Sequence, residues 1–287
     1  MAGEWAAEFR LSITRALADQ LATTLATLVP APLEPGHVSK IKPRPGVYEL
    51  FVNGERVYVG KAAKTLNGRL GQHLRKLSGR RGLDLGAVRF VCAYVDEDLD
   101  AAAPERLLIK QYRASESVPW NTNGFGNKDP GRNRDTSVVK AAHFDAIYPI
   151  DLQHRVALTP SVRDVEDALD AAKAELPYRL RFDNSAAAKR IYRGAAVSLP
   201  STPLPVEDLA DRLVADLPEG WQLTALPGYL ILYRETRVYE SALGWWRSRP
   251  DRTVEYQAGP SRFAPGGVDT DDTSSDPGEP DPREPDA

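Results

Sequence analysis

The amino-acid sequence predicts an α+β fold, and three observations support this prediction. Two β-rich runs flank Asn53-Gly54, a dipeptide typical of a tight turn between antiparallel strands. Residues 64–78 carry leucines at helical spacing, and the following run 87–95 has the composition of a strand. Farther along, residues 156–258 alternate between helical and strand-like patterns, which indicates a second, smaller α+β domain.

Composition divides the 287 residues into four predicted segments. The first is an amphipathic helix with a linker, because apolar side chains recur about every fourth position between Glu4 and Val29. We interpret this helix as a core element, and a helix at a dimer interface is the alternative. The segments are 1–36 (helix and linker), 37–155 (a basic module), 156–258 (an accessory domain) and 259–287 (an acidic, disordered tail).

Charge is distributed unevenly along the chain, although its net value is only −3. Residues 37–140 contain 19 Lys and Arg against 11 Asp and Glu, whereas residues 141–287 contain 16 against 25. A basic module in an acidic chain suggests a polyanionic partner for that module. The single cysteine, Cys92, permits no intramolecular disulfide, which fits a reducing cytoplasm. We expect no membrane association, because no segment has the composition of a membrane span.

The predicted hairpin 45–61 holds two tyrosines, and the length of its turn decides where they point. A two-residue Asn-Gly turn places Tyr48 and Tyr58 on opposite faces of the hairpin. A three-residue turn that includes Val52, with Gly54 left-handed in a bulge, pairs the tyrosines directly on one face. We predict the second geometry, because two phenols can serve one site only if they converge.

Further polar side chains follow the hairpin in helices and a loop. Arg69 and His73 lie four residues apart and therefore share one face of the helix predicted there. Glu105 falls in the first turn of a helix that Pro104 begins, and Asn121 opens a loop rich in Asn, Gly, Asp and Arg. Each residue alone suits an ordinary structural role. Their order along the chain is the informative feature.

That order resembles the signature of the GIY-YIG nuclease superfamily. The elements of the signature are here Gly46-Val-Tyr48, Tyr58-Val-Gly60, Arg69, Glu105 and Asn121. His73, one turn after Arg69, and the run 123–132 resemble the type II restriction endonuclease branch, especially its CCGCGG-cutting members. The resemblance covers about residues 37–150. It implies a GIY-YIG-like fold, a small, mainly antiparallel three-stranded sheet flanked by helices.

The resemblance also implies a Mg²⁺-dependent endonuclease that hydrolyses phosphodiester bonds in DNA. Glu105 would bind one Mg²⁺ per active site, with Mn²⁺ as a substitute, because hard cations favour carboxylate, water and phosphate oxygens. Arg69 would hold the non-bridging phosphate oxygens. Two candidates for the general base stay open, Tyr48 and Lys61.

The remaining site residues have supporting roles. Tyr58 would position water or phosphate, and His73 would donate to phosphate or assist proton transfer. Asn121 would support the substrate or the metal-bound water. The loop cations expected to contact the DNA backbone or a guanine edge are Lys128, Arg132 and Arg134.

We therefore predict a site-specific double-strand DNA endonuclease of a restriction system. A homodimer on a palindromic target would place one active site on each strand, and a cognate DNA methyltransferase is the expected genetic partner. Two alternatives stay open: a structure-specific nuclease of repair or of a mobile element, and a non-catalytic DNA-binding module. The intact residues Tyr48, Tyr58, Arg69 and Glu105 argue against the second alternative.

Overall fold

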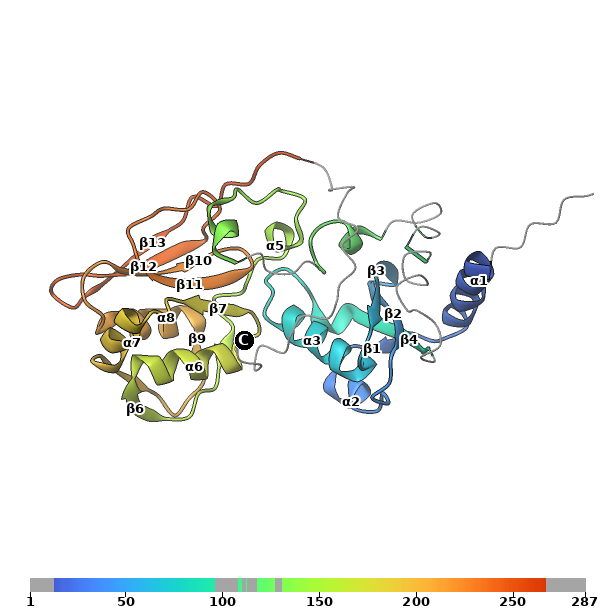
Figure 1. The fold of residues 1–287 in the computed structure, drawn as a ribbon, viewed down its shortest axis with the longest axis horizontal. Coiled ribbons are helices and arrows are strands. Elements are labelled where there is room, and N and C mark those ends of the chain that lie inside the picture. Colours follow the sequence, from blue (N-terminus) through green and yellow to red (C-terminus); the bar gives the residue numbers. More distant parts are fainter. Residues whose placement is uncertain (1–12, 96–107, 110–111, 113–117, 127–130, 267–287) are drawn as a thin grey trace, which may run out of the picture. The chain divides into compact units, whose positions relative to one another are not determined.

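A computed structural model of the chain describes residues 13–95, 108–109, 112, 118–126 and 131–266 (Figure 1). Contacts divide it into two compact units. Unit 1 contains residues up to Gly71 and Gly86–Asn121, and unit 2 contains Gln72–Leu85 and most residues from Thr122 onward. Both units combine helices with mainly antiparallel strands, so the α+β class is confirmed. Within the described residues, no helix is both long and apolar enough to cross a membrane.

Unit 1 is built on an antiparallel sheet with the strand order β1-β4-β2-β3. Its three long strands are the predicted ones, β2 (Gly46–Val52), β3 (Glu55–Ala62) and β4 (Val88–Tyr94). A fourth strand, β1 (Ala31–Pro32), pairs with the outer side of β4. The sequence did not predict β1, because two residues that include a proline are too short to show a strand period.

Helices cover both faces of this sheet. α3 (Leu66–Ser78) packs on one face, where Leu66 approaches Gly46 so closely that an added Cβ would lie 2.6 Å from Leu66 Cδ1. On the other face, strand valines meet α1 (Ile13–Ala26) and the described residues Leu108, Ile109, Tyr112 and Val118. This core comprises Leu25, Val47, Val59, Val91, Val95, Leu108, Tyr112 and Val118. The described part of the first helix therefore packs inside unit 1. A short helix, α2 (Pro35–Val38), precedes β2.

The β2–β3 hairpin closes in a two-residue turn, so the predicted three-residue turn is wrong. Val52 pairs with Glu55, and the two residues between them adopt positive φ angles, 52° for Asn53 and 85° for Gly54. Positive φ at both positions is the geometry of a type I′ turn, whose twist matches that of the flanking strands. A turn of this length alone would direct the two tyrosines to opposite faces.

A β-bulge restores their convergence. The register of the two strands shifts by one residue next to Leu50. Tyr48 therefore pairs with Gly60, and Tyr58 pairs with Leu50. Because paired residues share a face and alternate residues return to it, Tyr48 and Tyr58 lie on one face. They are diagonal neighbours, not the directly opposed pair that we predicted.

Unit 2 contains a five-stranded sheet with the order β13-β12-β10-β11-β7. β10 (Trp221–Ala225) and β11 (Tyr229–Arg234) form an antiparallel hairpin. β7 (Arg179–Phe182) joins β11 in parallel, and β12 (Gly244–Ser248) and β13 (Val254–Ala258) complete the other side. Two short ladders accompany the sheet, β5 (Arg155–Val156) with β9 (Leu204–Pro205) and β6 (Ser161–Asp164) with β8 (Ala196–Leu199).

Three helices cover one face of this sheet, namely α6 (Val165–Glu175), α7 (Ala186–Arg193) and α8 (Val206–Ala215) (Figure 1). α6 begins after Asp164, which caps it by accepting a hydrogen bond from the Asp167 backbone N–H. The opposite sheet face contacts a 3-10 segment, Gly131–Thr136, which precedes α5 (Phe144–Ile147). Two further 3-10 turns are Leu85–Ala87 and Pro119–Asn121.

Replacement of Gly60 by alanine tests the hairpin geometry. An added Cβ would lie 2.3 Å from the Tyr48 hydroxyl oxygen and 2.6 Å from Tyr58 Cε1, and both rings are buried. We expect Gly60→Ala to lower the free energy of unfolding by about 1–3 kcal/mol, the usual cost of overpacking a core. Urea unfolding followed by circular dichroism measures this change.

Gly71→Ala is the matched control, because Gly71 lies in α3 and an added Cβ would have nothing within 4 Å. Alanine favours a helix over glycine by about 1 kcal/mol, so this variant is expected to raise the urea midpoint. An equal loss of stability in both variants would contradict the close approach of Tyr48 to Gly60.

Candidate active site

Tyr48 and Tyr58 form the centre of the candidate site in unit 1. Their ring centroids lie 6.1 Å apart with an interplanar angle of 40°, and their residue exposures are 0 % and 3 %. Gly60 permits this arrangement, because a side chain there would overlap both rings. Gly46 has a similar steric role, since an added Cβ would lie 2.3 Å from the carbonyl oxygen of Ala93. Both triplet glycines are therefore required by close packing.

Arg69 reaches Tyr48 from helix α3. Its Nε donates a hydrogen bond of 3.3 Å to the Tyr48 hydroxyl oxygen, and the residue is buried. The helix is anchored on this side by Leu66 and Leu70, which are fully buried. A cationic donor at a phenolic oxygen stabilises negative charge on that oxygen, and burial strengthens the effect. The structure thus gives Arg69 a contact with Tyr48 in addition to the phosphate role expected for it.

Asn121 forms hydrogen bonds with β3, the strand that carries Tyr58. Its Oδ1 accepts a hydrogen bond of 2.8 Å from the Val59 backbone N–H, and its Nδ2 donates one of 2.7 Å to the Val59 carbonyl. β3 is the edge strand of the sheet, so Asn121 satisfies backbone groups that a further strand would otherwise pair. We expected Asn121 to meet substrate or water. In the structure its amide holds the backbone between Tyr58 and Gly60.

Lys61, the second candidate base, does not join the tyrosines. Lys61 pairs with Val47, whose side chain belongs to the core on the face that α1 covers. Successive side chains of a strand point to opposite faces, so Lys61 is directed away from the face of Tyr48. The register therefore brings Tyr48, Tyr58 and Arg69 together and leaves Lys61 apart.

His73 lies four residues after Arg69 on α3 but belongs to unit 2. It is 3 % exposed and stacks on Phe125, with ring centroids 5.0 Å apart and an interplanar angle of 21°. Phe125 belongs to the run 123–132 that resembles the restriction branch. The sequence indicated His73 as a candidate but not its aromatic partner, because nothing in the spacing of a loop residue shows which helix it meets.

Glu105, the expected metal ligand, lies outside the described residues, as does Lys128. Among the residues that are described, no three His, Cys, Asp or Glu side chains gather into a metal-binding cluster. Mg²⁺ commonly binds one or two carboxylates and completes its shell with water and substrate phosphates. A single carboxylate such as Glu105 would suit that donor set. Its position stays a prediction.

The two described loop cations have different surroundings in unit 2. Arg134 donates to Asp145 Oδ2 over 3.0 Å and lies 3.0 Å from His143 Nε2, so its guanidinium is engaged inside the unit. The Arg132 side chain is 66 % exposed and lies 4.3 Å over the ring of Tyr233. Of this pair, Arg132 is therefore the residue that a nucleic acid could reach.

Asp145 is a buried carboxylate in unit 2 that is surrounded by cationic side chains. Arg80 Nη1 lies 2.9 Å from Asp145 Oδ1, and Arg134 contacts the other oxygen. Burial opposes ionisation of Asp145, but the charges of Arg80, His143, Lys76 and Arg134 outweigh it and lower its pKa to about 2. The approach depends on Gly228, where an added Cβ would lie 2.5 Å from Asp145 Oδ2. The sequence showed no sign of this pairing between distant residues.

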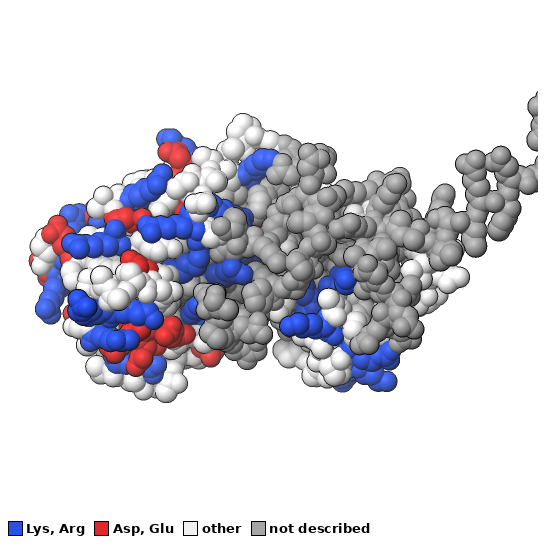
Figure 2. Space-filling view, viewed as in Figure 1, with Lys and Arg blue, Asp and Glu red and all other residues white. Residues whose placement is uncertain are grey.

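A basic segment that the sequence analysis did not single out lies at the start of the tyrosine hairpin. It consists of Lys40, Lys42 and Arg44, which are exposed. The Arg44 carbonyl accepts a hydrogen bond of 2.9 Å from the Leu66 N–H, which ties the segment to the first turn of α3. Figure 2 shows Lys and Arg side chains, without Asp or Glu, on the coloured surface around α2. The Lys-X-Lys-Pro-Arg pattern in the sequence could have identified this basic segment.

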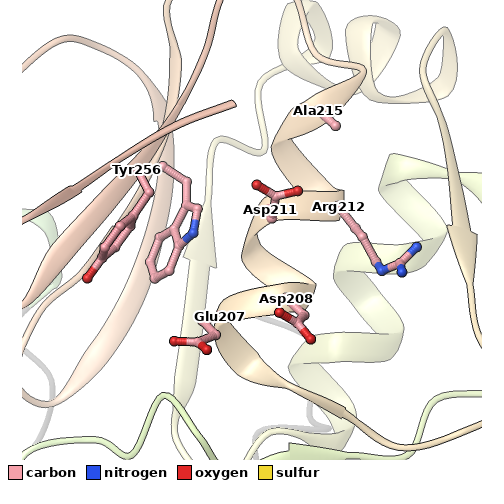
Figure 3. Close-up of a pocket in the computed structure, with 7 residues that line it drawn as sticks. Glu207, Asp208, Asp211, Arg212, Ala215 and Tyr256 are labelled. Carbon is pink, nitrogen blue, oxygen red and sulfur yellow. The ribbon is translucent and has the colours of Figure 1, made fainter. Parts of the chain in front are cut away.

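A groove in unit 2 lies apart from these residues. Figure 3 shows it between α8 and the strands β12 and β13, and its volume is about 750 Å³. The groove is lined by Glu207, Asp208, Asp211, Arg212, Ala215, Trp246 and Tyr256. Three carboxylates against one guanidinium give this lining a negative charge, which repels phosphate. The lining therefore does not favour the phosphate backbone of a nucleic acid.

The tyrosine hairpin and the arginine-bearing helix lie in a segment that is similar to a nuclease domain, which indicates a nuclease that acts on DNA. Residues 44–118 match the family described as the GIY-YIG catalytic domain. The match contains the hairpin, α3 and β4, and thus Tyr48, Tyr58 and Arg69. Nucleases with this domain generally depend on a divalent metal ion. No curated protein matches the chain.

Replacement of Asn121 by aspartate tests its hold on β3. A carboxylate keeps the acceptor for the Val59 N–H but places an oxygen against the Val59 carbonyl, which then has no donor. We expect Asn121→Asp to lower the free energy of unfolding at pH 7 by about 1–3 kcal/mol. Asn133→Asp is the control, because Asn133 is exposed. Equal urea midpoints for the two variants would contradict the proposed hold.

Acid unfolding tests the ionisation of Asp145. Its pKa is about 2 in the folded protein against an ordinary 3.8, so its charge stabilises the fold above about pH 4. This stabilisation, roughly 2 kcal/mol, is lost as the pH falls from 4 towards 2. We expect the unfolding free energy of the wild type to decrease over this range by more than that of Asp145→Asn. Parallel curves in urea titrations between pH 2 and 5 would refute the assignment.

Proposed function

We propose that this chain is a site-specific double-strand DNA endonuclease of the type II restriction class. The observation that carries the proposal is the hydrogen bond from Arg69 Nε to the Tyr48 hydroxyl, 3.3 Å, inside a matched GIY-YIG catalytic domain. This hydrogen bond places the cationic side chain of Arg69 at the hydroxyl of Tyr48, the proposed proton acceptor. The ring of the second phenol, Tyr58, lies beside the Tyr48 ring. Phosphodiester hydrolysis needs these elements, because water must lose a proton beside a negatively charged phosphate.

Tyr48 is the better candidate for the general base. A phenol ordinarily releases its proton near pH 10, so it needs a neighbouring cation to accept a proton from water at neutral pH. Arg69 is such a neighbour, whereas Lys61 is directed to the other face of the sheet. After its own hydroxyl proton has been released to solvent, the Tyr48 phenolate Oη would take a proton from the attacking water, and Tyr58 would orient that water or the phosphate.

The proposed cofactor is one Mg²⁺ per active site, which Mn²⁺ can replace. Glu105 would hold the ion through its carboxylate. When bound, the ion supplies positive charge to the phosphate and to the leaving oxygen. Arg69 would add a second positive charge, because its terminal nitrogens extend beyond the Nε that meets Tyr48.

Basic residues of both units support DNA as the substrate. In unit 1 the segment Lys40, Lys42 and Arg44 adjoins the first turn of α3, where it would contact the phosphate backbone. In unit 2 the exposed Arg132 would contact DNA directly. We further propose a cytoplasmic homodimer on a palindromic target, protected in its host by a cognate DNA methyltransferase. We also propose a division of the chain into a helix and linker (1–36), a nuclease domain (37–155), an accessory domain (156–258) and an acidic tail (259–287).

Cleavage of unmethylated phage DNA by the purified protein tests the proposal. We expect discrete fragments with Mg²⁺ or Mn²⁺ and none with EDTA, and sequencing of the fragment ends identifies the target. Tyr48→Phe is expected to lower kcat by about 10²–10⁴-fold, the usual contribution of a general base. Glu105→Ala is expected to abolish cleavage. Lys61→Met is the matched control for the base and is expected to retain most activity.

Other outcomes would replace the proposal with a different one. Preferred cutting of branched over linear duplexes would indicate a structure-specific nuclease of repair or of a mobile element. Salt-sensitive DNA binding without cleavage, in wild type and Glu105→Ala alike, would indicate a DNA-binding module. A greater loss of kcat in Lys61→Met than in Tyr48→Phe would assign the base to Lys61.

A further inference from the structure

We propose that Phe125 is a positioning residue that fixes the imidazole ring of His73 for DNA cleavage. This inference rests on the proposed function, because it assigns a role within the same reaction. Phe125 lies beyond residues 44–118, the segment that matches the catalytic domain. The chain outside the matched domain therefore supplies part of the surroundings of a candidate site residue inside it.

The first step of the argument is the geometry of the stack. The rings of His73 and Phe125 are nearly parallel, at 21°, and their centroids lie 5.0 Å apart. Both residues are buried, with exposures of 3 % and 1 %. A ring stacked on one face of an imidazole prevents the imidazole from tilting towards that side. Because imidazole donates and accepts protons in its ring plane, fixing that plane also fixes the directions in which its two nitrogens act.

The second step is that Phe125 is itself held in place. The ring of Phe144 lies 4.7 Å from it at an angle of 58° and closes another side. Lys76 Nζ lies 4.9 Å from the Phe125 ring centroid and donates a hydrogen bond of 2.5 Å to the Phe125 carbonyl. Lys76 follows His73 by three residues on α3, so one face of this helix supplies both contacts.

The third step concerns the backbone before Phe125. Gly124 adopts φ +86°, and an added Cβ there would lie 2.1 Å from His143 Nε2. The Asn123 carbonyl accepts a hydrogen bond of 2.6 Å from the Phe144 N–H. The backbone just before Phe125 is thus hydrogen-bonded to the start of α5 at Asn123 and packed closely against it at Gly124. Such fastening suits a group that must hold another ring at a defined angle.

A purely structural role for Phe125 would predict a different set of effects. Removal of a core ring would then lower stability, and it would lower activity independently of His73. A positioning role predicts instead that activity falls because the His73 ring is no longer held in its orientation. The decisive variants are Phe125→Leu, which removes the ring, Phe125→Tyr, which retains it, and Phe125→Met, a second ring-free variant for use if the leucine variant does not fold.

Proton NMR of the full-length protein tests the stack without any substrate. The chain contains four histidines, so its imidazole signals are few, and a His73→Gln variant identifies the signal of His73. Protons above an aromatic face are shielded, and we expect the His73 signal to lie upfield. It should lose that shift in Phe125→Leu and keep it in Phe125→Tyr. An unchanged His73 signal in Phe125→Leu would overturn the proposal.

Cleavage kinetics test whether the stack matters for the reaction. We expect Phe125→Leu to lower kcat by about tenfold or more with little change in KM, and Phe125→Tyr to restore most of it. In the double variant His73→Gln/Phe125→Leu, the loss should equal that of His73→Gln alone, because residues that act through one another are not additive. Additive losses would show a structural role and overturn the proposal.

The two readouts separate this inference from the proposed function. If the wild type cleaves DNA and the losses are additive, the proposed function stands and the positioning role fails. If the wild type does not cleave DNA, the proposed function fails, and the catalytic role of Phe125 fails with it. The NMR shift would in that case still report whether Phe125 orients His73.

Discussion

The contact between the Tyr48 ring and the backbone at Gly60 is the constraint on which the candidate site depends. The ring can cross from β2 to β3 only because position 60 has no side chain. This crossing brings its hydroxyl within reach of Arg69 and leaves room beside it for Tyr58. Glycine in an edge strand weakens that strand, and the Asn121 amide compensates by satisfying the adjacent Val59 backbone. The chemistry and the stability of the hairpin therefore depend on the same few atoms.

Much of this could be predicted from the sequence, because its determinants are local. The hairpin, α3 and the three long strands follow from the Asn53-Gly54 turn and from apolar periodicity. The bulge near Leu50 could not be predicted, since it depends on how two strands align and not on either strand alone. The Asp145 network is also non-local, because Arg80 is distant from Asp145 in the chain. Only tertiary structure shows which cations are engaged internally, as Arg134 is, and which are exposed, as Arg132 is.

Aromatic ring contacts and buried charges both stabilise unit 2. Phe125, Phe144 and Tyr148 form a continuous series of ring contacts beneath His73. Cations lie along the same series, with Arg80 5.3 Å from the Phe144 ring centroid. Cation–ring attraction and ion pairing thus stabilise one segment together, and loss of either leaves a buried charge without full compensation. Phe125 and its aromatic neighbours are consequently held by several modest contacts instead of by one strong contact.

The β-bulge has a consequence for how hairpins of this kind can vary in length. With a two-residue turn and no bulge, two tyrosines on opposite strands share a face only when their residue numbers differ by an odd number. One extra residue, in the bulge or in the turn, makes the required difference even, and the residue numbers of Tyr48 and Tyr58 differ by ten. The three-residue turn that we predicted and the two-residue turn with a bulge have the same parity, so both place the phenols on one face. Insertions and deletions in this hairpin should therefore occur in pairs, or be matched by the gain or loss of a bulge.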